Sequence, residues 1–287
     1  MINFTLGFSP CPNDTFIFDA LVNKKIDTGD FSFTARLEDV ETLNELAKKE
    51  ALDFTKISYG VLPIVAQKYI VLNSGSALGK GVGPLLISKK SVDFNDFENY
   101  IIAIPGENTT AHLLFSLAFP NAKKKVFKRY DEIENCVLDS ENTLGVIIHE
   151  NRFTYMEKGL HKIVDLGNFW EEKTGLPIPL GGIVGRRTMD EKTLMKVDAL
   201  IKESMEYAFE SYPLITDYVK QHSQEMEPDV MNKHIDLYVN KFSINLGNEG
   251  RNAVQKFIDV YNRINDKNPK STYSDKELFV DEEPFPV

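Results

Sequence analysis

Apolar residues recur along the first half of the chain with two different spacings. Ile2–Phe8 is a short and mostly apolar run that favours a β-strand, whereas in Val40–Lys49 the apolar residues recur at helical spacing. Segments of both kinds then alternate. The expected strands are Phe31–Leu37, Asp53–Ile57, Tyr69–Leu72, Gly83–Ser88, Tyr100–Gly106 and Thr143–Glu150, and the further expected helices are Asp14–Asn23, Gly60–Gln67 and Thr110–Phe119. This alternation predicts an α/β protein with parallel sheets and crossover helices.

The pattern changes after Asp190, where three long segments with helical spacing follow one another. We therefore expect two α/β lobes: residues 1–88 and 187–287 form the larger lobe, and residues 89–186 form the smaller one. The chain would cross between the lobes near residue 88 and return near Pro179–Arg187. Two crossings make a hinge, and a ligand would bind in the cleft at the carboxyl ends of the strands.

Charge and composition narrow the classes of partner. The 287-residue chain has a formal net charge of −10, and an acidic surface repels phosphate backbones, so we expect no nucleic-acid partner. No apolar run approaches the ~20 residues that a membrane helix needs. The N-terminus lacks the basic region and apolar stretch of a signal peptide, and the only two cysteines lie far apart. Both features are typical of a cytoplasmic protein.

The turn after the first strand has the unusual sequence SPCPND (residues 9–14). Its two prolines fix φ, and each holds the preceding residue extended. Asn13 or Asp14 would then cap the following helix. Two interpretations stay open: the turn is only a stiff helix cap, or its polar side chains, Ser9 included, form part of a binding wall.

Two further segments place polar groups where a cleft is expected. Thr109 and Thr110 come between an expected strand and an expected helix, where a hydroxyl can cap the helix and unpaired N–H groups can hold an anion. The simpler interpretation is that one threonine is only a cap. Lys56 and Ser58 lie in an expected strand; a lysine buried there would need an anionic partner, unless it extends to the surface.

Four apolar residues, at 144 and 146–148, precede His149, which ends an expected buried strand. The carboxyl end of a strand is where catalytic groups lie in open α/β sheets, and histidine can exchange a proton near neutral pH. A hydrogen-bonded structural histidine is an equally good interpretation. No HExxH or Cys/His cluster occurs in the sequence, so we expect no zinc site and a structural role for Cys11. The glycine-rich Gly75–Gly81 is one residue short of a phosphate-binding loop.

Eight blocks, spread over nearly the whole chain and in a fixed order, are together more specific than any single motif. They are SPCPNDTFIF, LEDVETLN, TKISY, SALGKGVGP, PGENTTA, IIHENRFTY, DLGNFWEEKTGLPIPLG and YVNKFSINLG. In these blocks the chain resembles the 1,4-dihydroxy-6-naphthoate synthase family of the futalosine route to menaquinone. Ser76 and Asn151 stand where that pattern has Gly and Ser, and neither position is a proposed catalytic group.

The resemblance implies a two-lobed fold like that of type II periplasmic binding proteins, with a hinge and an interlobe cleft. It implies a carbon–carbon lyase that cleaves cyclic dehypoxanthine futalosine, an anionic small molecule, to 1,4-dihydroxy-6-naphthoate and a dihydroxyacetone-like fragment, without a metal or other cofactor. By position, His149 matches the family's base. The implied substrate-contacting residues are Lys56, Ile57, Ser58, Thr109 and Thr110, with the opening turn adding Ser9, Asn13 and Asp14. The alternatives are a non-catalytic binding protein for small anions and the sister enzyme that dehydrates chorismate.

Overall fold

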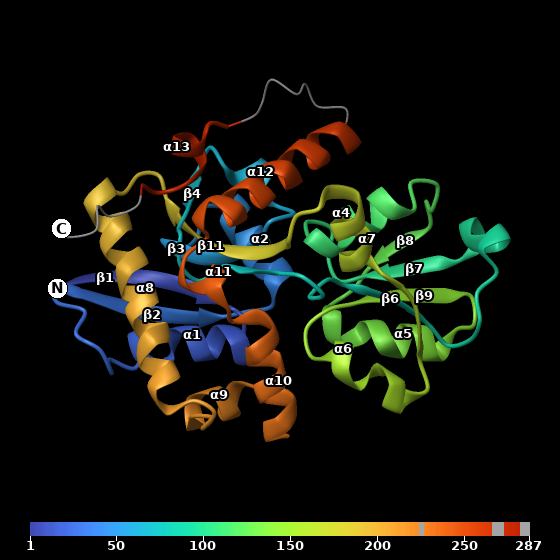
Figure 1. Cartoon of the computed structure of the whole chain (residues 1–287), viewed down its shortest axis with the longest axis horizontal. Coiled ribbons are helices and arrows are strands. Elements are labelled where there is room, and N and C mark those ends of the chain that lie inside the picture. The colour runs from blue at the N-terminus through green and yellow to red at the C-terminus, as the bar shows by residue number, and fades with distance from the viewer. Residues whose placement is uncertain (224–226, 266–272, 282–287) are drawn as a thin grey trace.

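Two β-sheets lie side by side along the long axis of the molecule, each with helices packed around it (Figure 1). The structure is a computed structural model that describes residues 1–223, 227–265 and 273–281. The N-terminus lies in the lobe built on the first sheet, and the helices after residue 190 return to that lobe (Figure 1). This arrangement follows the alternation and the C-terminal helical run expected from the sequence.

The first sheet has the strand order β2-β1-β3-β11-β4, with β5 also paired to β11. The strands are β1 (Ile2–Phe8), β2 (Phe31–Leu37), β3 (Phe54–Ser58), β4 (Tyr69–Val71), β5 (Ala77–Gly79) and β11 (Ile178–Arg186). β1 runs parallel to β2 and β3, whereas β11 runs antiparallel to β3, β4 and β5. The expectation of a parallel sheet is therefore wrong for the half that contains β11.

The second sheet has the order β10-β6-β9-β7-β8. Its strands are β6 (Leu85–Ser88), β7 (Ile101–Ile104), β8 (Lys125–Phe127), β9 (Thr143–Ile147) and β10 (His161–Asp165). β7 is parallel to β8 and β9, and β6 is antiparallel to β9 and β10. As in the first sheet, the antiparallel strand is one that the chain enters or leaves at a crossing.

Both crossings can be followed along the chain. The chain leaves the first sheet after β5 and has joined the second by Leu85. It returns in β11 (Ile178–Arg186), which overlaps the segment Pro179–Arg187 where the return was expected. β11 contains a proline and three glycines, so it reads as a linker in the sequence. It is nevertheless mostly buried, because β3, β4 and β5 pair with it.

Most expected helices are present, although the first one begins differently. The helices are α1 (Pro12–Val22), α2 (Val40–Lys48), α3 (Leu62–Val65), α4 (Thr110–Ala118), α5 (Ile133–Asp139), α6 (Asn151–Thr154), α7 (Leu166–Thr174), α8 (Glu191–Ser211), α9 (Asp217–His222), α10 (Pro228–Tyr238), α11 (Lys241–Ile244), α12 (Gly247–Ile264) and α13 (Asp275–Leu278), with 3₁₀ turns at Phe94–Asn99, Tyr130–Glu132 and Tyr155–Lys158. The expected cap at Asn13 or Asp14 is wrong: α1 begins at Pro12 and its N-cap residue is Cys11. Proline suits the first helical position, since its fixed φ is helical and its missing N–H would be unpaired there. None of the described helices combines the length and apolar character that a membrane span needs.

The start of α4, in the second lobe, is held against the first lobe. Asn108 donates from its backbone N–H (3.1 Å) and its Nδ2 (2.8 Å) to Glu41 Oε1 on α2. Gly60 passes so close to Thr109 that a Cβ at residue 60 would lie 2.4 Å from the Thr109 carbonyl carbon. No residue with a Cβ fits at position 60, because the chain just after β3 packs directly against the N-terminus of α4. These two segments therefore form one continuous wall.

Candidate active site

A pocket lies where the two lobes meet. Its walls come from the turn after β1, the end of β3, β11, the start of α4, the chain after β9 and the end of α10. All nine candidate residues from the sequence line it: Ser9, Asn13, Asp14, Lys56, Ile57, Ser58, Thr109, Thr110 and His149. The roles assigned to them stay predictions.

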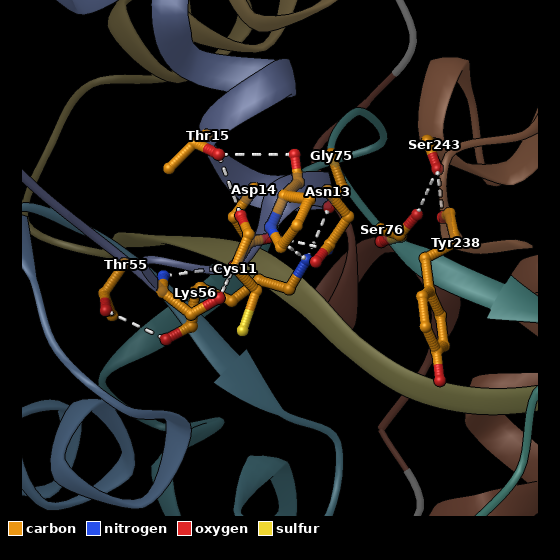
Figure 2. A network of polar contacts seen from close by, with 12 residues as sticks. Cys11, Asn13, Asp14, Thr15, Thr55, Lys56, Gly75, Ser76, Tyr238 and Ser243 are labelled. Atoms are coloured by element: carbon orange, nitrogen blue, oxygen red, sulfur yellow. Dashed lines mark hydrogen bonds and ion pairs between the residues drawn. The ribbon is translucent and has the colours of Figure 1, made fainter. Parts of the chain in front are cut away.

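Lys56 is buried and forms an ion pair within the protein. Its Nζ lies 2.9 Å from Asp14 Oδ1 and 3.1 Å from the Gly75 carbonyl oxygen (Figure 2). The other carboxylate oxygen of Asp14 accepts hydrogen bonds from the N–H and the hydroxyl of Ser9, at 3.1 and 2.7 Å. Since Asp14 neutralises the lysine, the pair adds no net charge to the pocket. It does fix the opening turn against β3.

Asn13 presents a hydrogen-bond acceptor with a fixed orientation. Its Nδ2 donates to Asp14 Oδ1 at 2.8 Å, and a carboxylate only accepts, so the amide nitrogen must face Asp14. Among the described residues nothing donates to Asn13 Oδ1, although the residue is only 6% exposed. A buried acceptor of this kind calls for a donor from a ligand.

The two threonines at the start of α4 already bond to the protein. Thr109 Oγ1 accepts from the His112 N–H (3.2 Å), which makes it the helix cap, and donates to the Gly106 carbonyl (2.9 Å). The Thr110 N–H donates to Ser58 Oγ at 2.7 Å, and its hydroxyl lies 3.0 Å from the Leu180 carbonyl on β11. The cap interpretation therefore describes Thr109, while Thr110 joins α4 to β3 and β11.

His149 lies two residues past the end of β9 and lines the pocket. Its φ is 56°, in the left-handed region, which costs a residue with a Cβ about 1–3 kcal/mol. Strained backbone conformations of this kind are most common at functional sites. Nδ1 lies 3.5 Å from Cys11 Sγ, and the ring contacts Tyr130 edge to face with centroids 5.0 Å apart. Burial lowers the pKa of His149 to about 4, so the imidazole is neutral at pH 7.

Three ionisable side chains lie beside His149: Glu150, which follows it in the sequence, and Cys11 and His234, which come from distant segments. Cys11 Sγ, a ring nitrogen of His149 and a carboxylate oxygen of Glu150 all lie within 4.8 Å of one another. His234 on α10 is fully buried, and its Nε2 lies 3.7 Å from Glu150 Oε2. Burial raises the pKa of the Cys11 thiol, which therefore stays protonated and is a poor nucleophile. No sequence motif could reveal this group, because its members come from three distant segments.

Comparison with a family model decides the chain's family. The model described as menaquinone biosynthesis matches residues 4–263. The chain belongs to this menaquinone biosynthesis family. Two curated relatives are both called 1,4-dihydroxy-6-naphthoate synthase. The one from Thermus thermophilus is 44% identical over 88% of this chain and 92% of its own length, and the one from Streptomyces coelicolor is 39% identical over 88% and 90%.

Solved structures, a periplasmic binding protein among them, share the fold. A protein of Archaeoglobus fulgidus superposes with a TM-score of 0.85 at 29% identity, covering 92% of this chain and 98% of its own. The periplasmic aliphatic sulphonate binding protein of Escherichia coli gives a TM-score of 0.62 at 10% identity, covering 99% and 94%. The fold and the resemblance predicted from the sequence are thus confirmed, and the chain is an enzyme of menaquinone biosynthesis.

Proposed function

We propose that the chain cleaves cyclic dehypoxanthine futalosine to 1,4-dihydroxy-6-naphthoate and a dihydroxyacetone-like fragment, with His149 as the general base. The observation that carries the proposal is the state of His149, a neutral imidazole in a strained backbone at the pocket wall. Carbon–carbon cleavage that ends in an aromatic ring must begin with the removal of a proton. Only a neutral imidazole can accept that proton.

The contact with Cys11 bears on which nitrogen of His149 acts. If Nδ1 carries the proton and its N–H donates a hydrogen bond to Cys11 Sγ, 3.5 Å away, the lone pair of Nε2 stays free to accept a proton. Among the described residues, Nε2 has no hydrogen-bond partner. In this tautomer Nε2 would take the substrate proton, and the Cys11 sulfur would hold the ring in place. General-base catalysis of this kind contributes roughly 10²–10⁴-fold to a rate.

The polar groups of the pocket suit an anionic substrate that also carries hydroxyls. Thr110 and Ala111, at the N-terminus of α4, line the pocket, and the positive end of the helix dipole there would favour a carboxylate. Asn13 Oδ1 would accept a hydrogen bond from a substrate hydroxyl. The Lys56–Asp14 pair would help to position the substrate, but it adds no net charge to the pocket. The cytoplasmic location expected from the sequence stays a prediction.

One incubation tests the proposal. Purified protein is mixed with cyclic dehypoxanthine futalosine or, separately, with chorismate, and the products are identified by liquid chromatography and mass spectrometry. We expect naphthoate and the three-carbon fragment in equal amounts from the first substrate and no reaction of the second. Binding without turnover would instead indicate a binding protein, and turnover of chorismate alone would indicate the sister dehydratase.

A further inference from the structure

We propose that Cys11, His149, Glu150 and His234 form a Zn²⁺ site behind the pocket, and that Zn²⁺ there joins the two lobes and inhibits the enzyme. The binding part of the proposal stands on geometry alone. The inhibition part rests on the proposed role of His149 as the base.

Two of the ligand pairs have spacings close to those of tetrahedral zinc. Zn–S bonds of about 2.3 Å and Zn–N bonds of about 2.0–2.1 Å place sulfur and nitrogen about 3.6 Å apart at the tetrahedral angle. Cys11 Sγ and His149 Nδ1 are 3.5 Å apart. Glu150 Oε2 and His234 Nε2 are 3.7 Å apart, about 0.3 Å more than the same geometry needs. Cys11 Sγ, a ring nitrogen of His149 and a carboxylate oxygen of Glu150 lie within 4.8 Å of one another, so zinc binding would draw these atoms and His234 Nε2 closer together by side-chain rotation.

His234 supplies the second, independent observation. The side chain is fully buried, and neither ring nitrogen has a hydrogen-bond partner among the residues that the structure describes. A buried imidazole normally has such a partner, so these nitrogens call for a ligand. A metal ion bound to Nε2 would satisfy one of them directly.

The charges of the four ligands also suit the ion. A thiolate from Cys11 and a carboxylate from Glu150 would balance the two positive charges of Zn²⁺, while the histidines bind as neutral imidazoles. The filled site would then carry no net charge, which is what a buried position requires. Binding would release the thiol proton to solvent, since the thiolate is the ligand form.

The ligands come from both lobes, which gives the site a consequence. Cys11 precedes α1 and His234 lies on α10, which packs against α1, so both belong to the first lobe. His149 and Glu150 follow β9 of the second lobe. An ion held by all four would resist opening of the cleft. It would also occupy Nδ1 of His149, so that Nε2 keeps its proton and cannot act as a base.

Cobalt titration tests the site without any substrate. Co²⁺ added to the wild-type protein should produce tetrahedral visible bands and a thiolate-to-metal charge-transfer band, saturating at one equivalent, and Zn²⁺ should displace it. Cys136, the second free cysteine, lies on α5 and is not one of the four proposed ligands, so Cys136→Ser is the matched control and should keep the band. Cys11→Ser should lose it, and His234→Ala should weaken Co²⁺ binding at least about tenfold.

A wild-type protein with no charge-transfer band overturns the proposal by itself, whether or not the variants fold. A band that persists in Cys11→Ser overturns it as well. Inhibition is measured separately: Zn²⁺ should lower turnover of the wild type and of Cys136→Ser, and EDTA should restore it. If the metal-free protein shows no turnover at all, the proposed function fails, and the cobalt titration still decides whether the site exists.

Discussion

Replacing Asp14 with asparagine keeps the shape of the side chain but removes the negative charge beside Lys56. The two side chains are 7% and 2% exposed, so the remaining ammonium would be held away from water with only neutral acceptors, namely the Gly75 carbonyl oxygen, 3.1 Å away, and the amide oxygen of the new side chain. Removing one partner of a buried ion pair typically costs about 3–5 kcal/mol. Because the contact to Gly75 survives, we expect Asp14→Asn to lower the free energy of unfolding by about 3 kcal/mol.

Urea unfolding followed by the fluorescence of Trp170 measures this loss, since Trp170 is the single tryptophan and is fully buried. The matched control is Glu45→Gln, which removes the charge from the Lys48–Glu45 pair. Its atoms are 2.6 Å apart, but its side chains are 34% and 42% exposed. An exposed pair of this kind is worth about 0.5 kcal/mol or less.

The double variant Asp14→Asn/Lys56→Met completes the comparison. Without the buried ammonium, most of the stability lost in Asp14→Asn should return, because an apolar side chain needs no counter-ion. The reasoning is refuted if Asp14→Asn costs no more than Glu45→Gln. It is equally refuted if the double variant is less stable than Asp14→Asn, since Lys56 would then contribute something other than an uncompensated charge.

Three further predictions follow from single groups. Asn13→Leu removes the free acceptor, so KM for the proposed substrate should rise by up to about tenfold, the worth of one neutral hydrogen bond; an unchanged KM would remove Asn13 from the site. Burial raises the pKa of Asp198 to about 6, so the folded state holds the Asp198 proton more tightly than the unfolded state does, and stability is lost as pH rises from about 4 to 6. The free energy of unfolding of Asp198→Asn, measured in urea relative to wild type, should therefore be about 1–2 kcal/mol higher at pH 7 than at pH 4. If this difference does not change with pH, burial does not penalise the carboxylate. Finally, kcat/KM should stay flat between pH 6 and 8 and fall as pH drops toward about 4, where His149 becomes protonated; a decline that begins near pH 7 would contradict the low pKa of His149.

The sequence predicted the two lobes and the pocket residues for a physical reason. Strand ends and helix starts carry their own local signals, and in an open α/β fold these ends converge on one cleft. His149, Thr110 and Lys56 were found in this way, and all three line the pocket.

Pairings between distant segments left no such signal. Lys56 was expected to need an anion, yet only the fold shows that Asp14 supplies it. β11 reads as a linker because its proline and glycines disfavour a strand, and tertiary pairing with β3 overrides that preference. His234 lies 85 residues beyond His149, and their proximity depends on the way α10 packs against α1.

The central claim is that His149 removes the proton that starts cleavage. The most direct test compares kcat of wild type and His149→Asn at saturating cyclic dehypoxanthine futalosine, with the affinity of both for substrate measured by calorimetry. Asparagine tolerates the left-handed backbone at this position, so the variant should fold normally while it lacks the base. We predict that kcat falls roughly 10²–10⁴-fold while the dissociation constant stays close to that of the wild type. Turnover at near wild-type rate would contradict the account and leave His149 as a structural histidine.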